Sequence, residues 1–282
     1  METEFIQIRN NQRGSWNTFS PGWKKWDDFT MRFLQEQGNQ IIHELNLNPS
    51  DKVLDIASGT GEPGLTIAAN ILQNGHVTAI DLSEHMLSIA QEKAETLSIK
   101  NFSVLAADAC DLPFEDASFD AISCRLGFMF FPDMKMAAKE MLRVLKPGGR
   151  LVATVWAEPT RNLWITTIMK VLNKHLELPA ANPNAPGLFR CASPGLLTTL
   201  FNEVGTGDGY ETDINGVMSC STSSEYWDFM NDVVPPVVSA LRSTSDDLRD
   251  SIRKEVSEIF EENIAQGNPM PYAARLFSAT KS

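Results

Sequence analysis

Residues 53–64 of the chain read VLDIASGTGEPG, a short apolar run followed by a glycine-rich turn. The glycines at positions 59, 61 and 64 have the spacing Gly-x-Gly-x-x-Gly. Residues 65–72 continue as an apolar stretch typical of a helix, so the whole run predicts a strand, a tight loop and a helix. Because glycine has no side chain, such a loop lets the backbone approach a ligand closely. The sequence therefore predicts a ligand site at this junction.

Strands and helices continue to alternate after this loop. Ser83 is a good N-cap residue and predicts the start of one helix, and a second helix is expected over residues 134–145. This alternation predicts an α/β fold, a doubly wound parallel sheet with right-handed crossovers. Ligands of such sheets bind at the carboxyl ends of the strands, so residues that directly follow strands are the candidates for chemistry. Further strands are expected at residues 76–80, 102–106, 119–124 and 151–156.

We expect three parts along the chain. Residues 1–50 form a helical, aromatic-rich N-terminal lid segment, and residues 51–157 form the cofactor-binding core. Residues 158–282 supply cap helices and the closing strands of the same sheet. In this last part we expect a loop at 179–187, a helix at 193–204, a strand at 208–216, helices within 223–265 and a final strand at 271–280.

Composition limits the partners of the chain. Its 282 residues carry a formal net charge of −12, which disfavours nucleic acid because phosphate binding requires clustered Lys and Arg. The four cysteines do not have the spacing of a zinc site, so no metal is expected. No apolar run approaches 18 residues, so we expect a cytoplasmic protein with no integral membrane segment. A homodimer is compatible with the sequence.

Three acidic residues follow successive expected strands: Asp55, Asp81 and Asp108. Asp55 and Glu62 flank the glycine loop, and no compensating Lys or Arg is expected near them. The pyrophosphate of a dinucleotide would meet like charge there. S-adenosylmethionine instead carries an ammonium group and a sulfonium, which suit a carboxylate by charge. The acids therefore favour S-adenosylmethionine over a nicotinamide dinucleotide.

Residues 53–156 resemble the class I S-adenosylmethionine-dependent methyltransferases, in particular the ubiquinone/menaquinone-biosynthesis-like group. The resemblance is carried by VLDIASGTG at 53–61, DLSEHML at 81–87, DACDLPFEDASFD at 108–120 and LRVLKPGG at 142–149. It implies a Rossmann-like seven-stranded sheet whose last strand is antiparallel, with a helical N-terminal segment and helical cap insertions. This chain departs from the family pattern at Ala57, where glycine is usual.

The resemblance also implies site residues. Asp81 is expected to bind the ribose hydroxyls, Asp108 and Ala109 the adenine, and Arg125 the methionine carboxylate. An aromatic stretch after the fourth strand is expected to form an apolar wall. The expected cofactor-binding residues are Asp55, Ala57, Ser58, Gly59, Gly61, Asp81, Leu82, Met86, Asp108, Ala109, Cys124 and Arg125. Those expected to touch the acceptor are Trp23, Phe128 and Phe130, and His175 is a candidate general base.

The expected function is S-adenosylmethionine-dependent methyl transfer to a small-molecule acceptor, at carbon, oxygen or nitrogen. Displacement at a sulfonium methyl group can be catalysed largely by positioning, so a dedicated base is optional. One alternative is a non-catalytic S-adenosylmethionine-binding partner protein, and another is an NAD(P)-dependent oxidoreductase. Labelled cofactor separates the first alternative from an enzyme, and affinity for NADH against adenosylhomocysteine tests the second.

Overall fold

The computed structural model describes residues 2–178, 182, 185–242, 244–267 and 269–282. Its strands are β1 (Lys52–Ile56), β2 (His76–Asp81), β3 (Phe102–Ala106), β4 (Phe119–Arg125), β5 (Leu145–Trp156), β6 (Tyr210–Met218) and β7 (Met270–Thr280). Its α-helices are α1 (Glu2–Lys25), α2 (Asp27–Leu45), α3 (Gly64–Asn70), α4 (Glu84–Thr96), α5 (Met134–Val144), α6 (Leu163–His175), α7 (Leu196–Val204), α8 (Ser223–Val233), α9 (Pro235–Leu241) and α10 (Asp246–Ala265).

The strands form one seven-stranded sheet in the order β3-β2-β1-β4-β5-β7-β6. Neighbouring strands from β3 to β5 are parallel, and β7 runs antiparallel to both β5 and β6. The sheet confirms the predicted α/β class, the seven strands and the antiparallel closing strand. The strand order reverses between β1 and β4, which is where a sheet of this kind binds its ligand.

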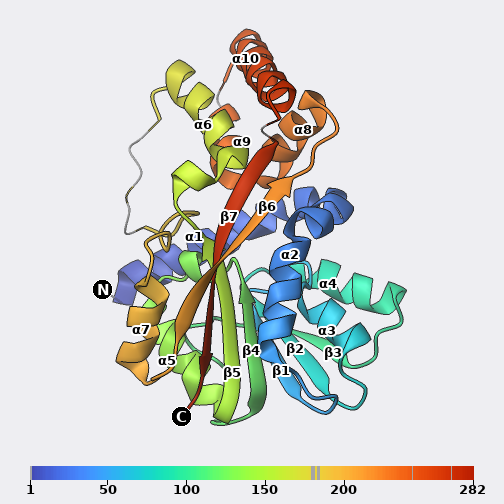
Figure 1. The fold of residues 1–282 in the computed structure, drawn as a ribbon, viewed down its shortest axis with the longest axis vertical. Coiled ribbons are helices and arrows are strands. Elements are labelled where there is room, and N and C mark those ends of the chain that lie inside the picture. The colour runs from blue at the N-terminus through green and yellow to red at the C-terminus, as the bar shows by residue number, and fades with distance from the viewer. Residues whose placement is uncertain (1, 179–181, 183–184, 243, 268) are drawn as a thin grey trace.

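Helices cover both faces of the sheet. Figure 1 shows α2, α3 and α4 on one face and α5 and α7 on the other. The helix starts follow from the sequence: the Ser83 hydroxyl accepts a hydrogen bond from the backbone N–H of Met86, as expected, and Asp133 caps α5 in the same way. Helix α2 lies against β4, β5, β6 and β7, and its buried side includes Phe29, Phe33 and Ile41.

The antiparallel pair β6–β7 extends beyond the rest of the sheet. Pairing between β5 and β7 stops at Trp156 and Ala274, whereas pairing between β6 and β7 continues to Met218 and Met270. Figure 1 shows this extension reaching towards α8 and α10, with α6 beside them. The helices that follow β6 are therefore attached to the sheet through a continuous pair of strands.

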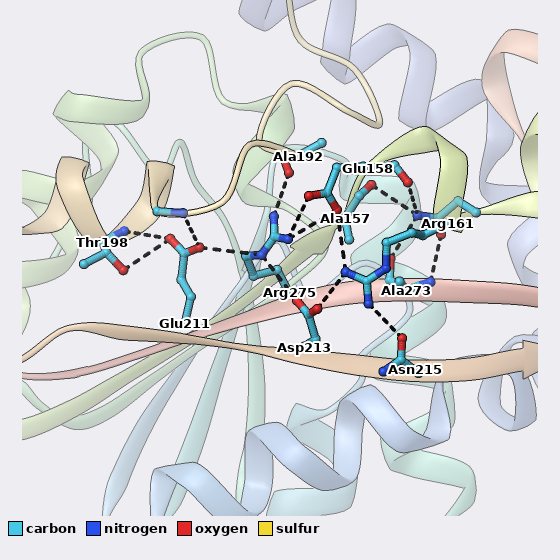
Figure 2. Close-up of polar contacts among 12 residues, drawn as sticks. Ala157, Glu158, Arg161, Ala192, Thr198, Glu211, Asp213, Asn215, Ala273 and Arg275 are labelled. Carbon is cyan, nitrogen blue, oxygen red and sulfur yellow. Dashed lines mark hydrogen bonds and ion pairs between the residues drawn. The ribbon is translucent and has the colours of Figure 1, made fainter.

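A buried arginine fixes the chain around this pair of strands. The guanidinium of Arg275 on β7 lies 3.2 Å from Glu158, 3.7 Å from Glu211 and 3.4 Å from Asp213 (Figure 2). It also donates a hydrogen bond of 2.6 Å to the carbonyl of Ala192. Because a buried charge is costly without its partners, these contacts tie the segments after β5 and before α7 to the sheet.

Two sequence expectations need correction or restriction. The fifth strand begins at Leu145 rather than at residue 151, because Leu145 already pairs with Phe119 of β4. The register shifts over the Pro-Gly-Gly segment, where Gly148 has a φ angle of +77° and its N–H donates to the carbonyl of Lys281. Of the loop expected at 179–187, residues 179–181 and 183–184 lie outside the described residues. Within the part that the structure describes, no helix has the length and apolar character needed to cross a bilayer.

Candidate active site

A large cavity opens at the carboxyl ends of the strands. The space between its walls is about 1290 Å³, a volume that includes open solvent. Residues that end or directly follow β1, β2, β3, β4 and β5 line it, together with side chains from α1, α2, α6, α8 and α9.

The glycine loop forms the part of the cavity next to β1. Gly59 and Gly61 have φ angles of +54° and +104°, which favour glycine. A side chain on Gly61 would also meet Leu65, because its Cβ would lie 2.6 Å from that residue. Ala57 has a φ angle of +54° as well, so its methyl group is held in a backbone conformation that costs an L-residue about 1–2 kcal/mol. The loop is thus kept in a strained shape at the cavity wall.

Asp81, the last residue of β2, lines the cavity with its carboxylate held in place. One oxygen accepts the N–H of Gly59 at 3.0 Å and the other accepts the N–H of Ser83 at 2.8 Å. Each carboxylate oxygen can accept a further hydrogen bond. Burial raises the pKa of Asp81, while these backbone donors oppose the rise. Two hydroxyl groups of one ligand can therefore reach both oxygens.

Asp108 follows β3 and lines the same cavity, as does Ala109. One carboxylate oxygen accepts the N–H of Cys110 at 2.9 Å. The other lies 3.5 Å from a guanidinium nitrogen of Arg9, which comes from α1. The first turns of α1 therefore lie over the end of the cavity that Asp108 occupies.

Asp55 is fully buried and faces inward from β1. It accepts the hydroxyl of Ser123 at 2.6 Å and the N–H of Gly64 at 3.1 Å, and it is not among the residues lining the cavity. Burial raises its pKa to about 7, while Ser123, Arg125 and Gly64 oppose the rise. Its clear local role is therefore to hold the start of α3 against β4.

Arg125 ends β4, lines the cavity and makes no hydrogen bond or ion pair within the described residues. Burial lowers its pKa, and the charges of Glu62 and Asp55 oppose that change. The sequence reading that the loop acids have no cation nearby is therefore wrong, because the fold brings Arg125 to them from about 60 residues away. A guanidinium without a partner in a cavity suits a carboxylate on a ligand.

The rest of the cavity wall is strongly aromatic. Trp16 packs edge-on against Trp23 at 6.3 Å and against Phe130 at 5.2 Å between ring centroids. The remaining aromatic side chains of the wall are Phe33, Phe131, Trp156, Trp164 and Phe229. Such a wall suits a flat or apolar molecule.

The structure brings most of the expected site residues together. Those that line the cavity are Trp23, Ala57, Ser58, Gly59, Asp81, Leu82, Met86, Asp108, Ala109, Arg125 and Phe130. Those that do not line it are Asp55, Gly61, Cys124, Phe128 and His175.

Two of these departures have a clear cause. Phe128 begins a short 3-10 turn and packs in the core against Phe131 and Phe201, so that Phe130 faces the cavity instead. His175 ends α6 and lies 2.7 Å from Glu255 of α10. That contact pairs two cap helices and gives His175 no route to the cavity wall.

Sequence reasoning missed several lining residues. Gln12 and Thr30 come from α1 and α2, and Phe229, Val233 and Pro235 come from the segment after β6. The sequence spacing gave a signal for Thr30, because it lies seven residues after Trp23, a spacing that places two residues on the same face of a helix. The residues after β6 gave no such signal, because they lie about 170 residues from the glycine loop.

Helices α1 and α2 are fixed to the remainder of the protein on two sides. The Trp26 ring N–H and the Lys25 ammonium both contact the carboxylate of Asp232 on α8, at 2.8 and 2.7 Å. At Gly22 the backbone of α1 approaches α8 so closely that a Cβ would lie 2.1 Å from the carbonyl oxygen of Asp232. On the other side Asn17 accepts the hydroxyl of Ser83 at 2.6 Å. The N-terminal helices therefore hold fixed positions over the cavity.

This geometry can be compared with known proteins. The model of the ubiE/COQ5 methyltransferase family matches residues 20–175, more than half of the chain. The chain belongs to this family. The match covers the glycine loop, Asp55, Asp81 and Asp108, and helix α2. The methyl donor implied by this family is S-adenosylmethionine, and the residues present fit it, since Asp81 has free acceptor capacity and the buried Ser58 hydroxyl in the loop has no partner among the described residues.

Individual relatives agree with this assignment. Demethylmenaquinone methyltransferase of Bacillus cereus is 34% identical over 137 residues, which are 49% of this chain and 53% of the relative. The chain thus matches about half the length of such curated relatives. Among solved structures, the YcgJ protein of Bacillus subtilis has a TM-score of 0.56 at 21% identity, covering 88% of this chain and 98% of that one. Phosphoethanolamine N-methyltransferase 2 of Haemonchus contortus, solved with S-adenosyl-L-methionine, has a TM-score of 0.53 at 18% identity, covering 87% and 52%. These two likenesses concern the fold.

Proposed function

We propose that this chain transfers the methyl group of S-adenosylmethionine to a small-molecule acceptor held in the same cavity. The observation that carries the proposal is Asp81, whose two oxygens are each held by one backbone N–H and each keep room for a ligand hydroxyl. Family membership supports the choice of methyl donor. The acidic lining supports it too, because the donor is a cation at sulfur.

The proposed cofactor site runs along the ends of β1, β2, β3 and β4. Asp81 binds the ribose, Asp108 and Ala109 bind the adenine, and Ser58 with Gly59 borders the methionine end. Arg125 binds the methionine carboxylate, which gives its unpaired guanidinium a partner. Asp55 does not line the cavity and makes no direct contact with the cofactor in this proposal.

The proposed acceptor site lies beside the cofactor, under α1, α2 and the helices after β6. The aromatic wall around Trp16, Trp23 and Phe130 favours an acceptor with an apolar body. S-adenosylmethionine supplies the methyl group when it is bound. The protein's own part is to exclude water and to hold the acceptor atom in line with that methyl group, an effect worth about 7–11 kcal/mol at best. His175 has no part in this proposal.

We also propose that residues 1–50 form a lid segment over a cofactor-binding core of residues 51–157, and that residues 158–282 supply cap helices and the closing strands of the same sheet. The demethylmenaquinone methyltransferases are quinone-modifying relatives by name, and their name does not fix the acceptor of a chain that matches half their length. A cytoplasmic location, a homodimer and the exclusion of nucleic acid as a substrate stay predictions of the sequence.

The proposal is tested by cofactor binding. Isothermal calorimetry with adenosylhomocysteine is compared for the wild type, Asp81→Ala and the control Asp111→Ala, whose side chain is exposed. Loss of two hydrogen bonds to a charged acceptor should weaken binding by at least tenfold in the first variant and leave the control unchanged. Equal effects at both positions would refute the assignment. Binding of NADH but not of adenosylhomocysteine would favour the oxidoreductase alternative, and binding without any methyl transfer from labelled cofactor to a metabolite extract would favour the non-catalytic one.

A further inference from the structure

One face of helix α1 lies over the cavity, from the end of β3 to the end of β4. Near the start of the helix, the guanidinium of Arg9 lies 3.5 Å from the carboxylate of Asp108, which follows β3. Seven residues later, the ring of Trp16 packs edge-on against Phe130, which follows β4, at 5.2 Å between ring centroids. Residues seven apart lie on one face of a helix. This face of α1 is therefore the one that contacts the cavity residues.

Gln12 lies on the same face, between these two contacts. It follows Arg9 by three residues and precedes Trp16 by four, the spacings of neighbours on one side of a helix. The residues beside it, Asn11 and Arg13, are exposed, whereas Gln12 is half-buried and lines the cavity. The side chain of Gln12 is therefore directed into the cavity.

A further hydrogen bond ties the same helix to the end of β2. The Ser83 hydroxyl donates to the side chain of Asn17 at 2.6 Å, and the Ser83 N–H donates to the carboxylate of Asp81 at 2.8 Å. Asp81 and Asp108 are the ribose and adenine contacts of the proposed function, so α1 is tied at both ends of a bound nucleoside. Gln12 lies between these two ties along the helix.

The amide of Gln12 is free to bind a ligand. It makes no hydrogen bond within the part of the chain that the structure describes. It is also not one of the polar groups that the core seals off from the cavity. A glutamine amide presents a carbonyl that accepts and an NH₂ group that donates. A ligand that uses both must offer an acceptor and a donor side by side.

Adenine offers such a pair on one of its edges. In the proposed function, Asp108 and Ala109 take one hydrogen of the N6 amino group and the N1 atom. The second N6 hydrogen and the N7 acceptor then stay unpaired on the neighbouring edge. These are the two atoms that a glutamine amide binds together when it recognises adenine.

We infer that Gln12 reads the N6/N7 edge of the cofactor's adenine, with its NH₂ group donating to N7 and its carbonyl accepting from N6. This inference rests on the proposed function, since it concerns the nucleoside end of the same cavity. Gln12 is a specificity residue for the base and has no part in the methyl transfer itself. Helix α1 then contributes to the choice of cofactor as well as covering the cavity.

The test compares adenosylhomocysteine with its 7-deaza analogue, in which a C–H group replaces N7 and the N6 amino group is kept. Calorimetry on the full chain should show adenosylhomocysteine binding about fivefold tighter or more, because the analogue cannot accept the hydrogen bond from Gln12. Gln12→Met keeps an unbranched side chain and a good helix former but removes both polar atoms. In this variant the two affinities should agree within about twofold.

Gln7→Met is the matched control, because Gln7 lies on the same helix but is exposed and bonds to Asn11. It should leave both affinities and their ratio unchanged. Circular dichroism of each variant shows whether the helix content is kept.

Three outcomes overturn the inference: equal affinity of the wild type for both ligands, a ratio that persists in Gln12→Met, or a ratio that also falls in Gln7→Met. Equal weakening of both ligands in Gln12→Met overturns it too, since that pattern reports packing alone. If the wild type does not bind adenosylhomocysteine, the proposed function itself fails, which is a distinguishable result.

Discussion

Gly127 and Ala57 meet at the cavity wall, and their contact makes a sharp prediction. Gly127 follows β4 with φ −94° and ψ −36°, a conformation that alanine adopts freely. An added Cβ would nevertheless lie 2.4 Å from the Cβ of Ala57 and 3.1 Å from the sulfur of Cys124. A Gly127→Ala substitution must therefore displace the glycine loop that carries Ser58.

The expected cost follows from overpacking, which typically destabilises a protein by about 1–3 kcal/mol. For a chain of about this size each kcal/mol lowers the melting temperature by roughly 2–4 °C. Adenosylhomocysteine binding should weaken as well, since Ala57 and Ser58 line the cavity. Urea unfolding followed by circular dichroism measures the first effect and calorimetry the second.

A second variant isolates the cause. Ala57→Gly removes the atom at 2.4 Å, and by itself it should change stability little, because relief of the positive φ is offset by the greater freedom of glycine in the unfolded chain. In the Ala57→Gly background, Gly127→Ala should lose most of its cost. Gly14→Ala on α1 is the matched control, because its Cβ would meet no atom within 4 Å. If Gly127→Ala costs the same in both backgrounds, within about 0.5 kcal/mol, the reasoning is refuted.

Two further predictions concern charge. Burial raises the pKa of Asp55 to about 7, so between about pH 4 and pH 7 the folded state binds more protons than the unfolded state, and this residue makes stability fall as pH rises. The free energy of unfolding of the wild type minus that of Asp55→Asn should thus decline across this window, by up to about 1.4 kcal/mol per pH unit; a flat difference contradicts it. Arg125→Gln should weaken the binding of adenosylhomocysteine by at least tenfold and should weaken the binding of decarboxylated adenosylhomocysteine far less. His175→Ala should change the affinity for neither ligand. Equal losses of affinity for both ligands in Arg125→Gln would contradict the proposed contact between Arg125 and the methionine carboxylate.

The cofactor side of the site could be predicted from the sequence because it is local. Asp81 and Asp108 each end or directly follow a strand that is recognisable by its apolar run, and parallel strands bring such residues to one edge. The fold class followed from the same alternation. The strained φ of Ala57 could not be predicted, since it depends on how the loop closes against Gly127.

The acceptor side was less predictable because it is assembled from distant segments. Phe229 and Val233 reach the cavity only because β6 and β7 carry α8 over it. The roles of Phe128 and Phe130 depended on the direction of a single 3-10 turn. The proximity of Arg125 to Asp55 and Glu62 required the pairing of β4 with β1, which spacing along the chain does not reveal.

The pairing of Met218 with Met270 has a consequence for engineering. These two residues are direct neighbours across β6 and β7, so the segment between them leaves and re-enters the sheet at one place. Residues 219–269 thus form a cassette with two adjacent junctions, and an exchange has to keep its contacts with α1 and Trp26 through Asp232. An exchange of this cassette would replace Phe229 and Val233. It would retain Asp81, Asp108 and the glycine loop. Chimeras made at these junctions could change the acceptor without altering the residues that we propose bind the methyl donor.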